Sequence, residues 1–272
     1  MVVAHRGASY DRAEHTLAAY VAAIDSGADA LECDVRLTRD GHLVCVHDRT
    51  VQRTSNGRGV VSELDLAGLR ALDFASWHDQ WPDSADQLLT DDAYLAGVAP
   101  DRLEPDGGVL LLDTLLGLVR DSARDVKLLI ETKHPTRYAG LVERRLVRLL
   151  DEFGWAGADS PARVMSFSWV ALRRIRRQAP DLELVMLVDS RTAWYRTRPF
   201  VDHDWGAGPG IEMVREHPEL IARIADHGTR VSCWVVNDEA DVDLCLELGI
   251  DGIITDRPGA VVTYLTQSGR RV

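Results

Sequence analysis

The sequence predicts an α/β fold, a (β/α)8 TIM barrel with a small insertion lobe after the second strand and its hairpin. Short apolar runs alternate with amphipathic helical patterns along most of the 272 residues, which is typical of parallel strands covered by helices. If the second and third runs form one bent hairpin, eight parallel strands remain, and eight βα units in about 250 residues suit a closed barrel. A doubly wound open sheet is the alternative. The segment His5–Ser9 after the first run, however, is not the glycine-rich phosphate loop that such sheets usually carry.

The apolar runs and helical patterns give one βα series along residues 1–272, which we expect to be a single domain. The expected strands are Val2–Ala4, Ala30–Val35, Leu43–His47, Leu128–Glu131, Val164–Phe167, Leu184–Val188, Gly210–Val214, Val231–Val236 and Gly252–Thr255. The expected helices are His15–Ser26, Thr114–Arg120, Arg137–Phe153, Trp169–Gln178, Pro218–His227 and Glu239–Leu248. Gly27 directly follows the first of these helices, which is typical of a helix stop.

Residues 49–108 interrupt the alternation and form the expected insertion. Its later part, 77–108, holds eight acidic residues and one arginine, together with frequent Pro and Gly. Long segments without repeats are often lids or binding elements, and a solvated loop is the simpler interpretation. We therefore expect a surface lobe here rather than a second core.

The composition excludes several classes of protein. Lys plus Arg is 31 and Asp plus Glu is 43, so the net charge is −12, and an acidic chain without a basic tract is poorly suited to nucleic acid or an anionic membrane. A hydrophobic content of 46% is ample for a core. No apolar run approaches a membrane span, and the first residues leave no room for a signal peptide, so we expect a cytoplasmic protein.

The four cysteines lie in apolar stretches and form no Cys-x-x-Cys pair. A free cysteine in such a place behaves as a small hydrophobic residue. We therefore expect buried thiols rather than disulfides, a zinc site or a catalytic residue.

Charged residues inside apolar strands are the first sign of chemistry, because a buried charge needs a partner. Glu32 and Asp34 share one face of their strand, whereas Leu31, Cys33 and Val35 share the other. Two carboxylates on one face repel each other unless a cation lies between them, and carboxylate oxygens suit Mg²⁺ or Ca²⁺. Two harmless acids at an exposed strand end are the alternative.

A third acid, Glu131, ends another apolar strand, and Lys133 shares its face. In a barrel the carboxyl ends of the strands meet at one mouth. Glu131 is therefore a candidate third metal ligand, and Lys133 a candidate contact for an anionic substrate. An ordinary surface Glu–Lys pair is the alternative.

Two histidines, His5 and His47, follow apolar runs near these acids. Asp40-Gly41 is a strong signal for a two-residue hairpin turn, and this turn would place position 34 opposite position 47. A slip of one residue would turn His47 away from the acids. A divalent ion, Arg6, Lys133 and two histidines would supply the charge neutralisation, base and acid that phosphodiester hydrolysis requires.

Several motifs together resemble the glycerophosphodiester phosphodiesterase family, in the family's order and over almost the whole chain. They are Ala4-His5-Arg6-Gly7, Glu14-His15-Thr16, Gly27–Val35, Thr38–Gly41, His47-Asp48, Ile130–Lys133, Ser166-Phe167, Trp234–Asn237 and Gly249–Pro258. Each motif alone is unspecific, but their combination is highly specific.

The resemblance implies a barrel with one divalent cation, Mg²⁺ or Ca²⁺, at its mouth and a small-molecule glycerophosphodiester as substrate. By position, Glu32, Asp34 and Glu131 would be the metal ligands. His5 would be the proton acceptor and His47 the proton donor. The remaining expected contacts are with the substrate: Arg6 and Lys133 with its phosphate, and Trp234 with the substrate as a whole.

Two positions depart from the family pattern. The family usually has Pro-Glu-Asn-Thr where this chain has Ala13-Glu14-His15-Thr16, so we expect Glu14 near the site and altered hydrogen bonds around His15. The usual Trp-Thr-Val-Asn is Trp234-Val235-Val236-Asn237 here, which loses a hydroxyl group.

Two alternative functions remain open. A phospholipase D-like activity on lysophospholipids or sphingomyelin would need an apolar patch, for which the candidates are Trp77, Trp81, Trp194, Tyr195 and Phe200. A barrel that binds phosphodiesters without hydrolysing them is the other. A non-catalytic relative would typically lack one of the three acids or two histidines, and all five are present.

Overall fold

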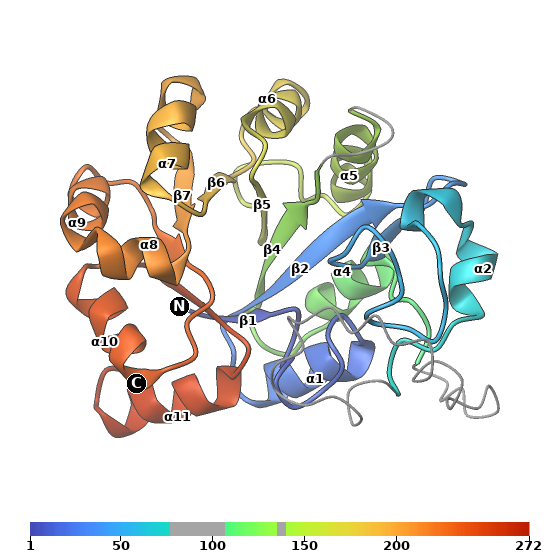
Figure 1. Ribbon diagram of the computed structural model, residues 1–272, viewed down its shortest axis with the longest axis horizontal. Coiled ribbons are helices and arrows are strands. Elements are labelled where there is room, and N and C mark those ends of the chain that lie inside the picture. The colour runs from blue at the N-terminus through green and yellow to red at the C-terminus, as the bar shows by residue number, and fades with distance from the viewer. Residues whose placement is uncertain (77–106, 135–139, 272) are drawn as a thin grey trace.

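The computed structural model describes residues 1–76, 107–134 and 140–271, and shows a ring of parallel strands with helices outside it (Figure 1). The parallel strands are β1 (Val2–His5), β2 (Ala30–Leu37), β4 (Lys127–Thr132), β5 (Ala162–Ser166), β6 (Leu184–Val188), β7 (Gly206–Pro209), β8 (Ser232–Cys233) and β9 (Gly252–Thr255). Their order is β7-β6-β5-β4-β2-β1-β9-β8. Two parallel bridges, Ala207 with Val231 and Gly210 with Trp234, join β7 to β8. The sheet therefore closes into the predicted (β/α)8 barrel.

Helices follow most of the strands and cover the outside of the barrel. They are α1 (Leu17–Asp25), α4 (Leu112–Arg120), α5 (Leu141–Glu152), α6 (Trp169–Gln178), α7 (Arg191–Thr197), α8 (Ile211–Glu216), α9 (Pro218–Asp226), α10 (Glu239–Glu247) and α11 (Pro258–Gln267). Side-chain oxygens of Thr16, Ser168 and Ser190 each accept a first-turn N–H, which fixes where α1, α6 and α7 begin.

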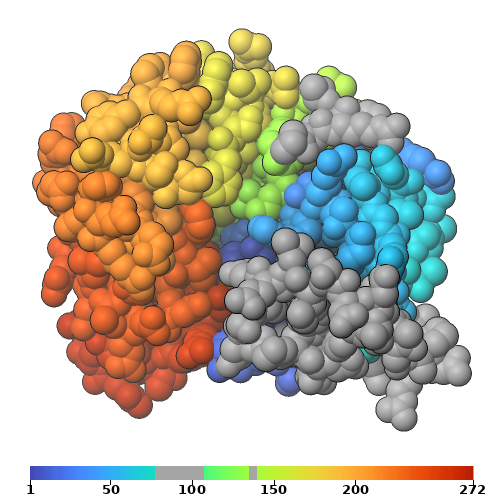
Figure 2. All heavy atoms as spheres, viewed as in Figure 1, coloured from blue at the N-terminus to red at the C-terminus, as the bar shows by residue number. Residues whose placement is uncertain are grey.

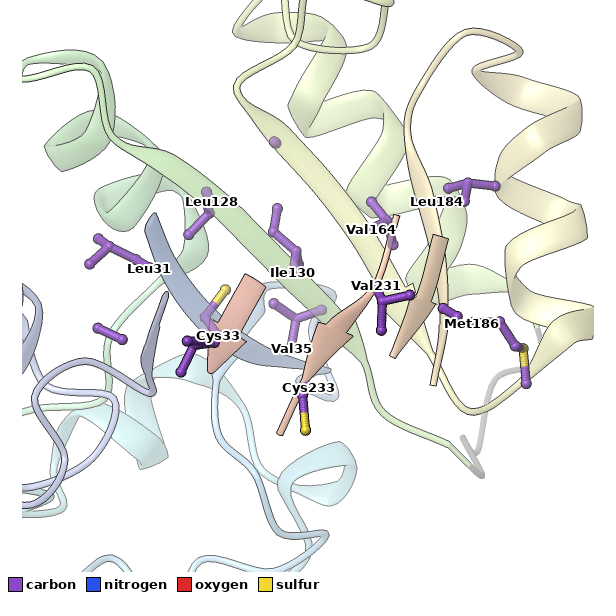
Figure 3. Packing of buried hydrophobic residues seen from close by; sticks show 14 of the residues in the cluster. Leu31, Cys33, Val35, Leu128, Ile130, Val164, Leu184, Met186, Val231 and Cys233 are labelled. Carbon is purple, nitrogen blue, oxygen red and sulfur yellow. The ribbon is translucent and has the colours of Figure 1, made fainter. Parts of the chain in front are cut away.

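Strand alternation divides the apolar residues into two layers. Leu31, Cys33 and Val35 of β2 point outward and pack in the cluster between barrel and helices (Figure 3). A smaller cluster fills the barrel interior and includes Ala30, Leu129 and other strand residues. Glu32 and Asp34 lie on the same face of β2 as Ala30, so they point inward as the sequence predicts. All four cysteines are buried free thiols, as expected.

The seventh strand corrects one prediction. The apolar run Gly210–Val214 is not a strand, because β7 is Gly206–Pro209 and Ile211 begins α8. β7 contains no β-branched residue, so its sequence does not indicate a strand. Its residues are small because the neighbouring strand leaves little room: a Cβ at Gly208 would lie 2.5 Å from Leu187 Cδ2. The apolar residues of 211–214 face the core as the first turn of a helix.

The β2–β3 hairpin corrects the expected register by one residue. β3 (Leu43–Cys45) pairs with β2 through Val35 and Cys45, so position 34 lies opposite position 46 rather than 47. Thr38 N–H donates to His42 O at 2.9 Å and Gly41 N–H to Thr38 O at 3.1 Å, with Gly41 at φ +89°. The turn therefore has three residues between the paired positions, and its left-handed position is filled by glycine.

The described part of the insertion has a small apolar core of its own, whereas the sequence predicts a surface lobe rather than a second core. Residues 49–76, which we call the lobe, contain η1 (Val61–Glu63) and α2 (Leu66–Arg70). Val51, Leu69 and Phe74 are buried there in a separate apolar cluster with Val44 of β3. The lobe is thus a small packed extension of the hairpin. Most of the acidic stretch, with Trp77 and Trp81, lies outside the described residues.

Within the described residues, no helix is both long and apolar enough to cross a bilayer.

Candidate active site

Three acids meet at the carboxyl ends of β2 and β4. Asp34 and Glu131 are partners in the parallel ladder, and Glu32 lies two residues earlier on the face of Asp34. One carboxylate oxygen from each of the three lies within 4.8 Å of the others, and all three side chains are buried. Because every donor in this set is a carboxylate oxygen, it suits a hard divalent ion such as Mg²⁺ or Ca²⁺.

The pKa directions show that this cluster carries excess negative charge. Burial, with the Asp34 and Glu131 carboxylates, raises the pKa of Glu32 well above its usual value. Burial and the neighbouring Asp34 likewise raise the pKa of Glu131 to about 7. Burial also acts to raise the pKa of Asp34. The contacts with Lys133, Arg6 and His15 together have the larger, opposite effect, so the pKa of Asp34 lies well below its usual value. A cation among the three oxygens would relieve the repulsion that Glu32 and Glu131 experience.

Two basic side chains compensate part of this charge. Lys133 Nζ lies 2.8 Å from both Asp34 Oδ1 and Glu131 Oε1. Arg6 Nε lies 3.2 Å from Asp34 Oδ2, but the two do not have hydrogen-bond geometry, and Arg6 Nε has no hydrogen-bond partner among the described residues. The Arg6 backbone N–H donates to Glu32 Oε2 at 3.1 Å, which ties the end of β1 to the acid cluster.

His5 is oriented by a carboxylate from the opposite end of the sequence. Its Nδ1 donates to Asp256 Oδ1 at 2.6 Å, and its Nε2 lies 4.0 Å from Glu32 Oε2. Ser9 and Asn237 also donate to Asp256, at 2.9 Å and 2.8 Å. Although burial acts to raise the pKa of Asp256, the contact with His5 contributes most to its net lowering. An ionised Asp256 fixes the His5 tautomer with Nε2 free to accept a proton.

His47 has a similar arrangement in spite of the shifted hairpin register. β3 ends at Cys45, so His47 lies in a bend where strand alternation no longer sets its direction, and it lines the same pocket as Glu32 and Glu131. Its Nδ1 donates to Asp48 Oδ1 at 2.7 Å. Burial is the largest cause of the lowered pKa of His47, and the contact with Asp48 opposes that shift.

One pocket of about 300 Å³ joins these groups at the barrel mouth. Its charged wall consists of His5, Arg6, Glu32, His47, Glu131 and Lys133. Its apolar wall consists of Met165, Phe167, Leu187, Trp234, Val235 and Ile254. Trp234 Nε1–H donates to Gly208 O at 2.8 Å, and the Trp234 ring packs edge to face against Phe167 at 5.5 Å. In Figure 2, dark blue atoms from the start of the chain lie recessed beside the orange atoms of the C-terminal part.

The structure therefore brings together the eight site residues that the sequence singles out: the three acids, two histidines, two cations and Trp234. Glu14 lies beside them but outside the acid cluster, since it pairs with Arg6 at 3.1 Å. His15 Nε2 lies 2.9 Å from Asp34 Oδ2 and forms a hydrogen bond with it.

The sequence alone assigns no role to Asp48, Asp256 or Arg53. Asp48 and Asp256 could have been suspected, because each is part of a motif that carries the family resemblance. Arg53 lies in the lobe, and no local pattern marks it. It donates to Asp48 and to Glu14 at 2.6–2.8 Å.

The fold is that of (β/α)8-barrel enzymes, and the groups at its mouth are those that a phosphodiester hydrolase needs. The sequence profile of the "Glycerophosphoryl diester phosphodiesterase family" matches residues 5–260. A Mycobacterium tuberculosis protein named "Probable glycerophosphodiester phosphodiesterase 1" is 46% identical over 99% of this chain and 93% of its own length. A Bacillus subtilis glycerophosphodiester phosphodiesterase is 31% identical over 95% of this chain and 84% of its own length.

Solved structures agree with the fold. An Oleispira antarctica phosphodiesterase, solved in complex with the product sn-glycerol-3-phosphate, superposes with a TM-score of 0.77 at 23% identity, over 98% of this chain and 96% of that chain. The present chain belongs to the glycerophosphoryl diester phosphodiesterase family and is an enzyme of that class.

Proposed function

We propose that this chain hydrolyses glycerophosphodiesters to glycerol 3-phosphate and an alcohol, with one Mg²⁺ or Ca²⁺ ion held by Glu32, Asp34 and Glu131. The observation that carries the proposal is that Glu32 and Glu131 of the acid cluster line one pocket together with two histidines that carboxylates orient, while Asp34 completes the cluster behind them. The names of the relatives at 46% and 31% identity support the substrate class.

The acid cluster would bind the cation through three carboxylate oxygens. When bound, a divalent cation in this position polarises a phosphoryl oxygen and orients the phosphate. Lys133, which lines the pocket and whose Nζ lies 2.8 Å from Asp34 Oδ1, would contact the phosphate. Arg6 also lines the pocket, and its guanidinium would be the second phosphate contact.

His5 would be the proton acceptor. Because Nδ1–H is committed to Asp256, the free Nε2 lone pair can take the proton of the attacking hydroxyl. The attacking group is either water or the substrate's own glycerol 2-hydroxyl. If it is the glycerol 2-hydroxyl, a cyclic phosphate forms first. The Asp256 carboxylate stabilises the imidazolium that results.

His47 would be the proton donor. Its Nδ1–H is held by Asp48, so a proton on Nε2 can pass to the leaving alkoxide. Burial lowers the pKa of this imidazole, which makes its protonated form a stronger acid. His5 would thus act on the attacking oxygen, whose bond to phosphorus forms, and His47 on the leaving oxygen, whose bond to phosphorus breaks.

The apolar wall would receive the carbon atoms of the substrate. Trp234 and Phe167 form its outer part, and Leu187 and Met165 its floor.

Among the aromatic residues proposed for a lipid patch, Trp194 is buried, whereas Tyr195 and Phe200 are exposed. The cytoplasmic location and the absence of a nucleic-acid partner remain predictions.

The test is hydrolysis of glycerophosphocholine by purified enzyme with Mg²⁺ or Ca²⁺ and with EDTA. We expect glycerol 3-phosphate and choline with metal, and neither product with EDTA. Activity that survives complete removal of divalent ions would contradict the metal role. Turnover of lysophosphatidylcholine in preference to glycerophosphocholine would favour the phospholipase D-like alternative. Tight binding without product would favour the non-catalytic barrel.

A further inference from the structure

Resting on the proposed function, we propose that Arg53 of the lobe is a positioning residue, which holds the proton donor His47 and the phosphate contact Arg6 in their working orientations. Arg53 lies outside the pocket lining, so it would act through Asp48 and Glu14 rather than on the substrate.

The contacts of Arg53 are specific and use all three of its nitrogens. Nε donates to Asp48 Oδ2 at 2.6 Å, Nη1 to Glu14 Oε2 at 2.8 Å and Nη2 to Glu14 Oε1 at 2.7 Å. Each carboxylate also has a second partner in the pocket wall. Asp48 Oδ1 accepts from His47 Nδ1 at 2.7 Å, and Glu14 Oε1 accepts from Arg6 Nη1 at 3.1 Å. One guanidinium therefore joins the two functional side chains through two bridges.

The charges of these groups and the buried position of Glu14 favour an arginine here. The Glu14 side chain is 9% exposed, and two carboxylates brought this close would repel each other without a cation between them. Burial acts to raise the pKa of Glu14 and Asp48. Contacts with cations and hydrogen-bond donors have the larger, opposite effect, so both acids stay ionised. A guanidinium offers a planar fork of N–H groups, whereas a lysine ammonium is a point charge that cannot reproduce all three bonds.

The bridge through Asp48 would act on the proton donor. With Oδ2 held by Arg53 and Oδ1 accepting from His47, the carboxylate cannot rotate, and the imidazole plane is fixed. Without Arg53, Asp48 could turn toward water and His47 would lose its orientation. The bridge through Glu14 would act in the same way on Arg6, whose Nη1 has Glu14 as a partner.

A purely structural role for Arg53, joining lobe to barrel, predicts different kinetics. Unfolding or displacement of the lobe would lower turnover of every substrate alike. Loss of an oriented proton donor matters most for an alkoxide, which needs a proton to leave, and little for 4-nitrophenolate, which leaves without one.

The experiment compares Arg53→Ala and Arg53→Lys with wild type on glycerophosphocholine and on glycerol 4-nitrophenyl phosphate, with saturating Ca²⁺ or Mg²⁺. Arg49→Ala is the matched control, because this exposed lobe arginine has none of the contacts described above. His47→Ala shows the pattern of a lost proton donor. We expect kcat on glycerophosphocholine to fall roughly 10–100-fold in both Arg53 variants, with less than about a threefold loss on the activated substrate. KM should rise for both substrates, and added guanidinium should partly restore Arg53→Ala.

Equal losses on both substrates, or unchanged kcat in Arg53→Ala, would overturn the inference. If wild-type enzyme hydrolyses neither substrate, the proposed function fails instead. The inference then has its own readout in a crystal structure of Arg53→Ala. A His47 Nδ1–Asp48 Oδ1 contact that stays at hydrogen-bond distance in that structure would overturn it regardless of activity, and a displaced imidazole would support it. A lowered Tm of Arg53→Ala does not confound this readout, because Arg53→Lys keeps the charge.

Discussion

The two walls of the pocket are built from the same kind of strand end but have opposite chemistry. β1, β2 and β4 supply buried charges that depend on one another, as in the contacts of Lys133 with Asp34 and Glu131. β5, β6 and β9 supply Met165, Leu187 and Ile254, which need no polar partner. Burying a charge costs stability unless it is paired, whereas burying an apolar group stabilises the fold. The first wall is therefore where we expect function to be maintained at the expense of stability.

The largest effect should come from the acid cluster. Glu32→Gln removes a charged ligand while keeping the size of the side chain, and the loss of a metal's contribution of several kcal/mol corresponds to roughly a thousandfold lower kcat/KM. Steady-state kinetics at saturating metal, together with calorimetric titration of Ca²⁺, would check this. Near-normal kcat/KM with intact metal binding would exclude Glu32 as a ligand.

The histidines should show the next largest effects. His5→Ala and His47→Ala should each lower kcat on the order of a hundredfold or more, with little loss of folding. Circular dichroism and thermal melts serve as the control for folding. A normal kcat in either variant would remove that residue from its proposed role.

The difference between the walls should be visible in stability. Leu187→Ala should lower the free energy of unfolding by roughly 2–5 kcal/mol. Glu131→Gln should raise it in metal-free protein by about 1–3 kcal/mol at pH 8. The sign follows because a folded pKa of about 7, above the ordinary 4.5, means that the ionised form opposes folding. That penalty develops between pH 4.5 and 7 and is complete above 7.

Denaturant unfolding in EDTA at pH 8 and pH 5 would measure both changes. The gain in Glu131→Gln should shrink toward pH 5, whereas the loss in Leu187→Ala should not depend on pH. If Glu131→Gln is less stable than wild type at pH 8, the Glu131 carboxylate stabilises the fold, and the proposed difference between the two pocket walls is wrong.

Metal affinity should depend on pH through the same carboxylate. The ion binds the ionised form, so lowering the pH through about 7 protonates Glu131 and weakens binding; this one group accounts for a change of at most about tenfold per pH unit. Calorimetric titration of Ca²⁺ at pH 6, 7 and 8, in buffers of different ionisation enthalpy, should reveal proton release. Affinity that is flat over this range would contradict a raised pKa at the metal site.

The smallest effect should come from the rim of the apolar wall. Phe167 is 43% exposed and packs on Trp234 at 5.5 Å, so Phe167→Ala should raise KM only a few-fold and leave kcat unchanged, because this contact is made equally in ground and transition states. A large fall in kcat would show that this wall takes part in the chemical step.

Much of the fold and the site could be predicted because strand alternation acts locally. The i, i+2 spacing of Glu32 and Asp34 placed both inside the barrel, and the strand ends placed Glu131 beside them. The strand β7 could not be predicted, because contacts with neighbours such as Leu187 require its small residues, and these residues have no propensity to form strands. The position of His47 was predicted from an incorrect register, and it lies at the pocket because the strand ends before it.

The partners of the histidines could not be derived from spacing. Asp256 reaches His5 across 251 positions of the chain, a contact that only closure of the barrel creates. Arg53 reaches Glu14 across 39 positions, and only the packing of the lobe brings them together. Contacts of this kind depend on tertiary structure, and no periodic pattern in the sequence predicts them.

The most direct test of the central claim is a crystal structure grown with Mn²⁺, with data collected at the manganese absorption edge. We predict one anomalous peak at roughly 2.0–2.6 Å from an oxygen of each of Glu32, Asp34 and Glu131, with the His5 and His47 Nε2 atoms facing the same pocket. A peak elsewhere, with Lys133 still bridging Asp34 and Glu131 and no ion among the three acids, would contradict it.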